Sequence, residues 1–221
     1  MLMSAGMPLP KSIFAHGWWL SGESKMSKSL GNVVNPLDLI EEYGIDPVRY
    51  YLMREMVLGQ DASFTLESFV KRYNSDLAND LGNLAGRVTT LIGRHFGGTI
   101  PGSGQLEYRD QELRDMGDAV STVIPDHIAS MRLSEAVEET MQYVRAINRY
   151  MERTEPWKLV KNNLERAGTV LYNATESLRQ VLVLLRPIMP VRTEAVLKMI
   201  GSEVDKVREP LKEGLPLGDF E

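Results

Sequence analysis

Apolar residues recur at steps of three and four along most of the chain, and this pattern predicts a mainly helical protein. The longest stripe runs from Thr65 to about His95 and predicts one continuous helix with a buried face. Further helices are predicted over residues 111–130, 134–154, 165–185 and 191–200, and a helical turn begins at Pro156. Because these helices are long and their connections short, the pattern predicts an antiparallel helix bundle.

The first part of the chain has a different pattern. Residues 1 to about 35 look irregular or extended, with a strand predicted over 12–20. Two helix starts follow, at Asn35-Pro36 and at Asp46-Pro47, each with a capping residue before a proline. We therefore predict a small α/β segment over residues 1–62, followed by the helical bundle over 63–221.

A polar loop lies between these early elements, from Gly22 to Asn32, and contains Lys25-Met26-Ser27-Lys28-Ser29. Two lysines three residues apart can reach different oxygens of one triphosphate, and the serine hydroxyls add donors. Lysines placed at the charge that builds on a leaving pyrophosphate lower the reaction barrier. Gly22 and Gly31 are candidate hinges for such a loop. The alternative is a solvated surface turn.

Composition limits the partners that are possible. The formal net charge of −5 gives no general basic field, so any RNA contact must be local. The chain has no cysteine and its three histidines are far apart, so we expect no metal site. Neither a membrane-spanning run nor a signal peptide is seen, and we expect a cytoplasmic protein without a membrane partner.

Several motifs together resemble one family. They are His16-Gly17-Trp18, the loop from Gly22 to Asn32, Tyr43 to Leu52, Arg54-Glu55, Phe69 to Leu84, Asn148-Arg149-Tyr150 and Glu155-Pro156-Trp157. This set resembles the later part of methionyl-tRNA synthetase, a class I aminoacyl-tRNA synthetase. The loop also resembles those of the isoleucyl, valyl, leucyl and cysteinyl enzymes, so the equivalent part of one of these is the alternative. The Asn-Leu-x-x-Arg helix and the Pro-Trp turn favour the methionyl member.

The resemblance implies an ATP site at the loop. In the family, the residues that match Lys25 and Lys28 are catalytic and stabilise the pyrophosphate of ATP. Ser27, Ser29 and His16 match positions that bind or line the nucleotide site. ATP, with Mg²⁺ in the full-length enzyme, and methionine are the implied small-molecule partners.

The resemblance also implies an anticodon site, because the residues that match Asn83, Arg87 and Trp157 read the CAU anticodon of methionine tRNA. Asn83 and Arg87 are four residues apart, hence on one helix face. An asparagine can pair with a base edge, while arginine and tryptophan offer stacking planes. The structural alternatives are that Asn83 caps or bridges helices, that Arg87 pairs with Asp80 or Glu155, and that Trp157 is a core residue.

Other parts of the family pattern are missing. No two histidines are separated by two residues, so nothing resembles the His-Ile-Gly-His motif of the catalytic half. We therefore expect a C-terminal piece of the enzyme that forms no methionyl-adenylate alone, and a monomer. A tRNA-binding module acting in trans with a separate catalytic chain, or a purely structural bundle that keeps the loop as a relic, remain as alternatives.

Overall fold

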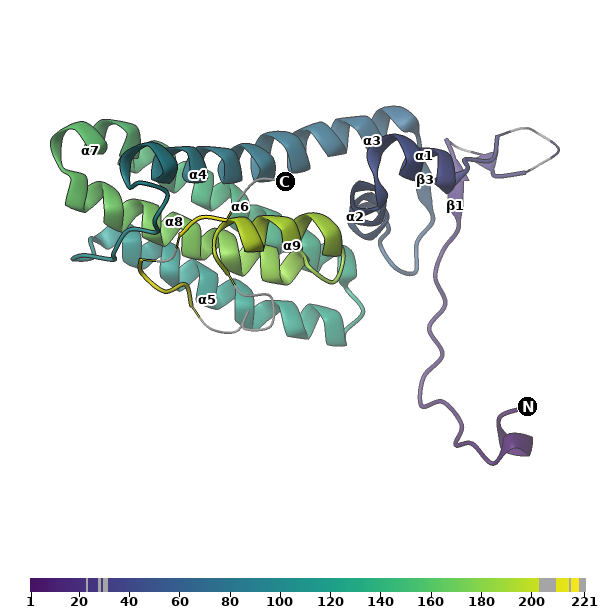
Figure 1. Ribbon diagram of the computed structural model, residues 1–221. Helices are drawn as coiled ribbons and strands as arrows, with labels where there is room; N and C mark the ends of the chain where they lie inside the picture. Colours follow the sequence, from purple (N-terminus) through teal and green to yellow (C-terminus); the bar gives the residue numbers. More distant parts are fainter. Residues whose placement is uncertain (23, 28, 30–31, 203–209, 215, 219–221) are drawn as a thin grey trace.

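The computed structural model describes residues 1–22, 24–27, 29, 32–202, 210–214 and 216–218. Most of them form a helical bundle, with a smaller segment at one end (Figure 1). The bundle helices are α4 (Asn83–His95), α5 (Tyr108–Ala129), α6 (Leu133–Thr154), α7 (Pro156–Asn162), α8 (Leu164–Leu185) and α9 (Pro190–Met199). The predicted mainly helical bundle is confirmed. Within the described ranges, no helix is both long and apolar enough to cross a membrane.

One rod of helix joins the small segment to the bundle (Figure 1). It consists of α3 (Leu66–Arg72), the π-helix η3 (Tyr73–Gly82) and α4, so the predicted helix from Thr65 to His95 is confirmed in extent. The wider π turns in its middle were not predicted. Thr65 and Ser68 form a full capping box, in which the Ser68 N–H donates to Thr65 Oγ1 at 3.1 Å.

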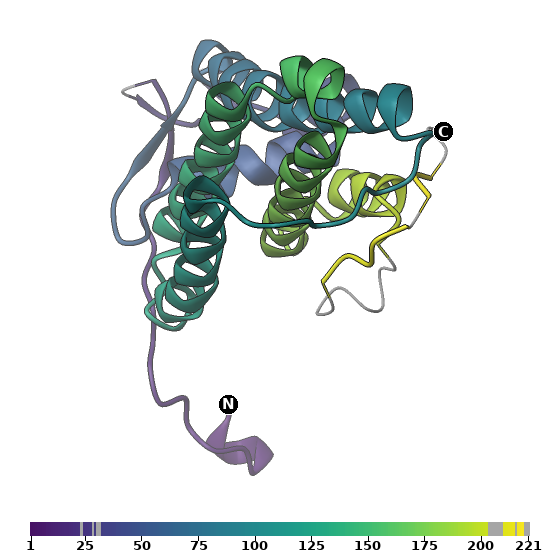
Figure 2. The same cartoon turned by 90° about the vertical axis from the view of Figure 1, so that its left-hand side faces the viewer.

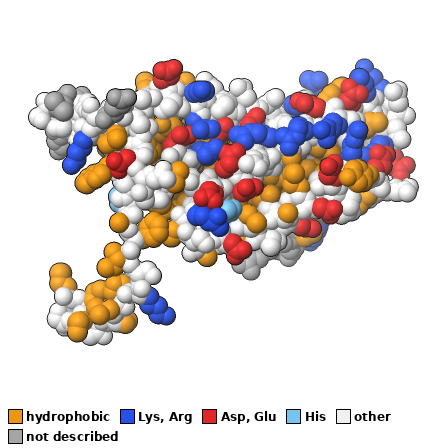
Figure 3. Space-filling model, turned by 180° about the vertical axis from the view of Figure 1, so that it is seen from behind, with side chains coloured by type: hydrophobic (Ala, Val, Ile, Leu, Met, Phe, Trp, Pro, Cys, Tyr) orange, Lys and Arg blue, Asp and Glu red, His pale blue; other side chains and the backbone are white. Residues whose placement is uncertain are grey.

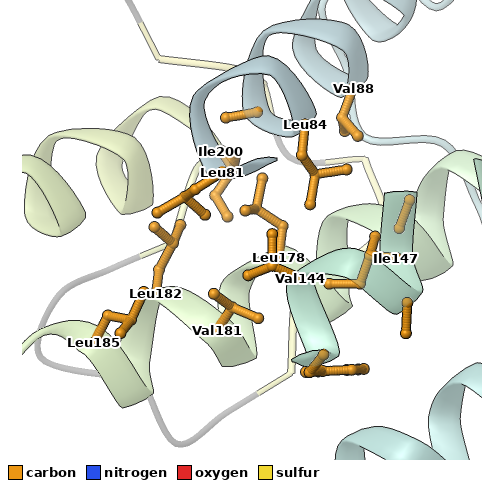
Figure 4. Packing of buried hydrophobic residues seen from close by; sticks show 14 of the residues in the cluster. Leu81, Leu84, Val88, Val144, Ile147, Leu178, Val181, Leu182, Leu185 and Ile200 are labelled. Atoms are coloured by element: carbon orange, nitrogen blue, oxygen red, sulfur yellow. The ribbon is translucent and has the colours of Figure 1, made fainter. Parts of the chain in front are cut away.

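The main core lies between the rod, α6 and α8 (Figure 4). Leu84 and Val88 of α4 point down onto Leu178 of α8, while Val144 and Ile147 of α6 close the side (Figure 4). All five are fully buried. Because each helix contributes one apolar stripe, burial of these faces against one another supplies the main stabilisation of the bundle.

The small segment holds a three-stranded sheet and two helices. Strands β1 (Trp19–Ser21), β2 (Ser24–Lys25) and β3 (Ala62–Phe64) lie in the order β2-β1-β3, with β1 antiparallel to β2 and parallel to β3. Helix α1 (Pro36–Tyr43) begins as predicted, and the Asn35 side chain accepts from the Leu37 N–H. Helix α2 (Ile45–Glu55) begins one residue before Asp46 with Gly44 as its N-cap, so the prediction that Asp46 caps this helix is wrong. Together they confirm the small α/β segment. Strand β3 was not predicted, because three residues give too little alternation to recognise.

The strand predicted over residues 12–20 is wrong for most of its length. Only its last two residues pair, and the chain before Trp18 extends away from the body in both ribbon views, with a 3₁₀ turn η1 at Met3–Ala5 (Figures 1 and 2). Ile13 and Phe14 are exposed. Their apolar character suggested a buried strand, but the described chain offers them no sheet or helix to pack on.

A second, smaller core supports the sheet. It contains Leu39, Val48, Tyr51, Phe64 and Phe69, with Trp19 packed at its edge. The rings of Phe64 and Phe69 each meet the Tyr51 ring edge-on, with centroids 5.4 Å apart. Because Phe69 belongs to α3, the rod is part of this core as well as of the main one.

Polar contacts from α2 tie the small segment to the end of the bundle. The Arg49 guanidinium donates to the carbonyl oxygens of Ile188 at 2.7 Å and Pro187 at 2.9 Å. Asp46 is buried and accepts from the backbone N–H of Arg192 at 2.5 Å, in the first turn of α9. A carboxylate at a helix N-terminus is favourable, so this contact both caps α9 and positions α2.

An ionic cluster joins the rod to α6. Arg145 pairs with Asp80 at 3.1 Å, Glu138 at 3.1 Å and Asp76 at 3.6 Å. The buried Asp76 also accepts from the Tyr50 hydroxyl at 2.8 Å. These contacts link α2, η3 and α6 through one group of charges.

The described part of the C-terminal tail packs along the loop that follows α4, over residues 97–104. Thr99 and Pro216 form an isolated antiparallel bridge, and the Leu217 N–H donates to the Gly98 carbonyl at 2.6 Å. Leu211 is buried against the main core. The described part of the tail therefore contributes to the core.

Candidate functional site

The lysine loop begins at a tight turn after β1. Gly22 has a φ of 62°, in the left-handed region that favours glycine, and Lys25 follows in β2. The Lys25 Nζ lies 4.4 Å from the centroid of the Trp18 ring, and Trp18 is 62% exposed. Trp18 thus lies beside the loop rather than in the core under it. Lys28, and Gly31 as a candidate hinge, lie outside the described residues.

Asn32 closes the described part of the loop. Its Oδ1 accepts from the Ser27 N–H at 2.8 Å, and its Nδ2 donates to the Lys25 carbonyl at 3.3 Å. The hydroxyls of Ser27 and Ser29 lie 2.8 Å apart. Both serines predicted to bind ATP are therefore side by side, next to Lys25. Sequence reasoning did not single out Asn32, whose role depends on the folded shape of the loop.

His16 lies apart from this group. It is exposed, and its Nδ1 lies 2.8 Å from the carbonyl oxygen of Gly17. Gly17 itself passes close to the chain before β3, since a Cβ there would lie 2.0 Å from the Gln60 carbonyl oxygen. In the described structure, no hydrogen bond joins His16 to Lys25, Ser27 or Ser29.

At the other end of the rod, Arg87 and Trp157 come together. The Arg87 Cζ lies 5.2 Å from the centroid of the Trp157 ring, within the range of a cation–π contact. Both side chains are half-buried, and Asn83 is exposed one helical turn away on α4. The structure therefore brings the three residues predicted for the anticodon site to one end of the bundle.

The structural alternatives for Arg87 and Asn83 do not hold. Asp80 pairs with Arg145, and Glu155 pairs with Lys158 at 2.7 Å, so neither carboxylate pairs with Arg87. Among the described residues, the side chain of Asn83 has no hydrogen-bond partner and caps no helix. Trp157 is only half-buried, which differs from a core residue.

The turn from α6 into α7 sets the position of Trp157. Glu155 has a φ of 47°, in the left-handed region that residues with a side chain rarely adopt. Pro156 follows as the first residue of α7 and is buried. The strained turn and the buried proline fix the direction of α7, and Trp157 lies in its first turn.

Within the described ranges, no group of three or more metal-ligating residues is found. Two groups of candidate binding residues remain. Lys25, Ser27 and Ser29 lie in the loop, and Asn83 and Arg87 lie beside Trp157 at the end of the bundle. The first set can bind phosphate oxygens. The second can stack on and hydrogen-bond to an unpaired base.

Comparison with known families gives the class. Residues 1–89 match the model of the tRNA synthetases class I (M) family, and residues 110–216 match that of the anticodon-binding domain of tRNA ligase. The loop lies in the first match and Trp157 in the second. The molecule is thus a class I aminoacyl-tRNA synthetase chain with an anticodon-binding domain.

Individual relatives define the member. The chain is 44% identical to the methionine–tRNA ligase of Clostridium acetobutylicum over 93% of its length, and 41% identical to that of Thermotoga maritima over 96%. Methionyl-tRNA synthetase of Mycobacterium tuberculosis, solved in complex with methionyl-adenylate, superposes on the whole chain with a TM-score of 0.94 at 35% identity. The chain belongs to the methionyl-tRNA synthetase family.

The match is to one part of these proteins. The chain covers 32% of the Clostridium protein, 34% of the Thermotoga protein and 45% of the Mycobacterium chain. It therefore spans about a third to a half of the length of the relatives that it matches.

Proposed function

We propose that this chain recognises methionine tRNA through the CAU anticodon, with Trp157, Arg87 and Asn83 as the reading residues. The observation that carries the proposal is the contact between Arg87 and Trp157 at 5.2 Å, beside an exposed Asn83 without a partner among the described residues. Two flat groups and one amide at one position suit a splayed base, which needs a stacking surface and a partner for its edge. The match of residues 110–216 to an anticodon-binding domain includes Trp157 and supports its assignment, while Asn83 and Arg87 lie in the match of residues 1–89.

The same proposal assigns the loop to ATP. Lys25 and Lys28 stabilise the pyrophosphate leaving group, and Ser27, Ser29 and His16 bind or line the nucleotide site. Lys25 is exposed, and the Ser27 and Ser29 hydroxyls lie 2.8 Å apart in the same loop, which supports a phosphate-binding role. The Mycobacterium relative binds methionyl-adenylate, which supports methionine and ATP, with its Mg²⁺, as the substrates of the full-length enzyme.

The wider reaction is the ATP-dependent attachment of methionine to its tRNA. In this proposal, residues 1–62 complete the catalytic domain and residues 63–221 form the anticodon-binding bundle. The protein acts as a monomer in the cytoplasm. The chain provides the lysine loop and the anticodon reader, and it depends on the remainder of the synthetase for adenylate formation.

Binding to tRNA tests the anticodon assignment. We expect the 221-residue chain to bind methionine tRNA more tightly than the same tRNA with an altered anticodon, measured by fluorescence titration. Trp157→Ala removes the stacking surface, which is worth about 1–3 kcal/mol per base, or about five- to 150-fold in affinity. This loss should fall on the CAU tRNA and so reduce the discrimination.

Trp18→Ala is the matched control, because it removes an exposed tryptophan at the other end of the molecule. It should leave the discrimination between the two tRNAs unchanged. Equal binding of both tRNAs by the unsubstituted chain, or full discrimination by Trp157→Ala, would contradict the proposal.

A further inference from the structure

Basic side chains form a row along the back of the molecule (Figure 3). Three arginines from two neighbouring helices line one small hollow: Arg109 of α5, and Arg149 and Arg153 of α6. The hollow has a volume of about 80 Å³. Its floor includes Leu113 and Ala146, so the charged groups lie over an apolar surface.

The side chains of Arg149 and Arg153 are unpaired among the described residues. Neither side chain forms an ion pair or a hydrogen bond there. Arg145, one turn earlier on α6, is instead paired with three carboxylates. Arginines four apart lie on one helix face, so the row on α6 changes from neutralised to unpaired toward its C-terminal end.

The helix dipole explains only part of this arrangement. A cation in the last turn of a helix is favourable, and Arg153 lies there, but the effect decreases within one turn and does not reach Arg149. In addition, Arg109 donates to the backbone carbonyl of Arg153 at 2.8 Å, which holds its positive charge close to the other two. Glu112 also lines the hollow but forms no ion pair with these arginines. Like charges held together in this way are stabilised by an anion from outside the chain.

We propose that this hollow binds a backbone phosphate of the tRNA, on the strand that continues from the base stacked on Trp157. The inference rests on the proposed function, and it adds a contact that carries no sequence information. Arg153 and Trp157 are only four residues apart, across the α6–α7 turn, so a nucleic acid seated on Trp157 passes close to the hollow. One guanidinium group can donate two parallel hydrogen bonds to two oxygens of a phosphate, which an ammonium group cannot do. A cluster of arginines therefore suits phosphate binding better than a cluster of lysines.

The proposal also explains how an acidic protein binds RNA. With a formal net charge of −5, the chain has no long-range attraction for phosphate, so binding needs a local cluster that is not neutralised. Phosphate contacts position a nucleic acid, while contacts to bases specify it. Removal of the arginines should therefore weaken binding equally for all anticodons.

The test is the salt dependence of tRNA binding by the Arg149→Gln/Arg153→Gln double variant of the 221-residue chain. We expect about tenfold weaker binding at low salt for both the CAU tRNA and the tRNA with an altered anticodon. The plot of log affinity against log salt should become less steep by about 1, because fewer counterions are released. The double variant with lysines at both positions should keep the steeper slope, since it keeps the charges.

Arg192→Gln is the matched control, because it removes one exposed arginine from α9, which lies in front of α8 in Figure 1. It should change neither the affinity nor the salt slope. Far-UV circular dichroism checks that each variant keeps its helices. An unchanged slope in the double glutamine variant, with anticodon discrimination intact, would overturn the phosphate site and leave the anticodon proposal standing. If the double glutamine variant lost only its discrimination between the two tRNAs, the phosphate site would also be overturned. Absence of tRNA binding by the unsubstituted chain would overturn both the phosphate site and the anticodon proposal.

Discussion

At the scale of single residues, the buried carboxylate of Asp110 is the main polar contact between α5 and its neighbours. Asp110 is fully buried and accepts from the Tyr150 hydroxyl at 2.6 Å and from Arg166 at 2.6 and 2.9 Å. It also accepts from the Glu107 N–H at 2.7 Å, as part of the capping box of α5. Asp110 therefore joins α5, α6 and α8, while the Nε of Arg166 pairs with Glu107 at 3.1 Å.

The pKa of Asp110 determines how this contact depends on pH. Burial acts to raise the pKa, but the hydrogen bonds from Arg166, Tyr150 and the Glu107 N–H outweigh it and lower the pKa below its ordinary value of 3.8. A carboxylate whose pKa is lowered on folding stabilises the protein above the unfolded value. That stability decreases as the pH falls through the folded value.

We therefore predict that Asp110→Asn reduces the free energy of unfolding by about 2–3 kcal/mol at pH 7, because Arg166 loses its buried partner. The difference between the variant and the original chain should decrease below about pH 4, as Asp110 becomes protonated in the original chain. Urea unfolding at pH 7 and at pH 3, followed by circular dichroism, measures both quantities. A difference that stays constant with pH would contradict the assigned cause.

The residues proposed to read the anticodon show how much the sequence alone could predict. The spacing of Asn83 and Arg87 places them on one helix face, and the structure has them so. The contact of Arg87 with Trp157 could not be predicted from spacing, because the two are 70 positions apart and meet only when α7 folds back. The same limit applies to Asp80, a candidate partner of Arg87 that pairs with Arg145 in the fold.

At the scale of elements, the rod from α3 to α4 depends on how it begins. The Thr65 hydroxyl accepts from the Ser68 backbone N–H, and the Ser68 hydroxyl accepts from the Thr65 backbone N–H. These two N–H groups have no partner within the helix and are satisfied in this way. Serine stands at the third position of this capping box, where glutamate or glutamine is usual. Glycines, prolines and capping residues were thus enough to predict most helix starts, but not the π turns of η3, which have no comparable local signal.

We predict that Thr65→Ala reduces the free energy of unfolding by about 1 kcal/mol, because the Ser68 N–H loses its acceptor. Thr65→Ser keeps a hydroxyl in the same place and should retain most of the stability. Urea unfolding of the original chain and the two variants measures the effect, with the same dependence of the free energy of unfolding on urea concentration used for all three. If the serine variant were as unstable as the alanine variant, loss of the hydroxyl could not be the cause.

At the scale of the whole molecule, the two cores are connected too closely to behave independently. Tyr50 of α2 belongs to the larger core, while Tyr51 of the same helix belongs to the smaller one. The rod contributes Phe69 to the smaller core and Leu84 to the larger one. Arg54 adds an ion pair to Glu138 of α6. These contacts, together with those of Asp46 to α9, join α2 to the bundle on several sides.

We predict that both cores unfold in one cooperative transition. Trp19 reports on the smaller core and Trp157 on the bundle, so single-tryptophan variants, with phenylalanine at the other two positions, separate the two signals. Their urea midpoints should coincide with each other and with the loss of helix by circular dichroism. An earlier midpoint for Trp19 would show that the small segment unfolds alone.

The length of the rod also sets the distance between the lysine loop and Trp157. Its first turns carry Phe69 in the core beneath the lysine loop, and its last turns carry Arg87 beside Trp157, so its number of residues sets the distance and angle between the two sites. An extra residue in α4 ahead of Arg87 would advance that side chain by about 1.5 Å and rotate it by about 100°. Trp157 is held by α6 and α8 and would not follow. The number of residues in this rod therefore fixes how far the lysine loop lies from Trp157.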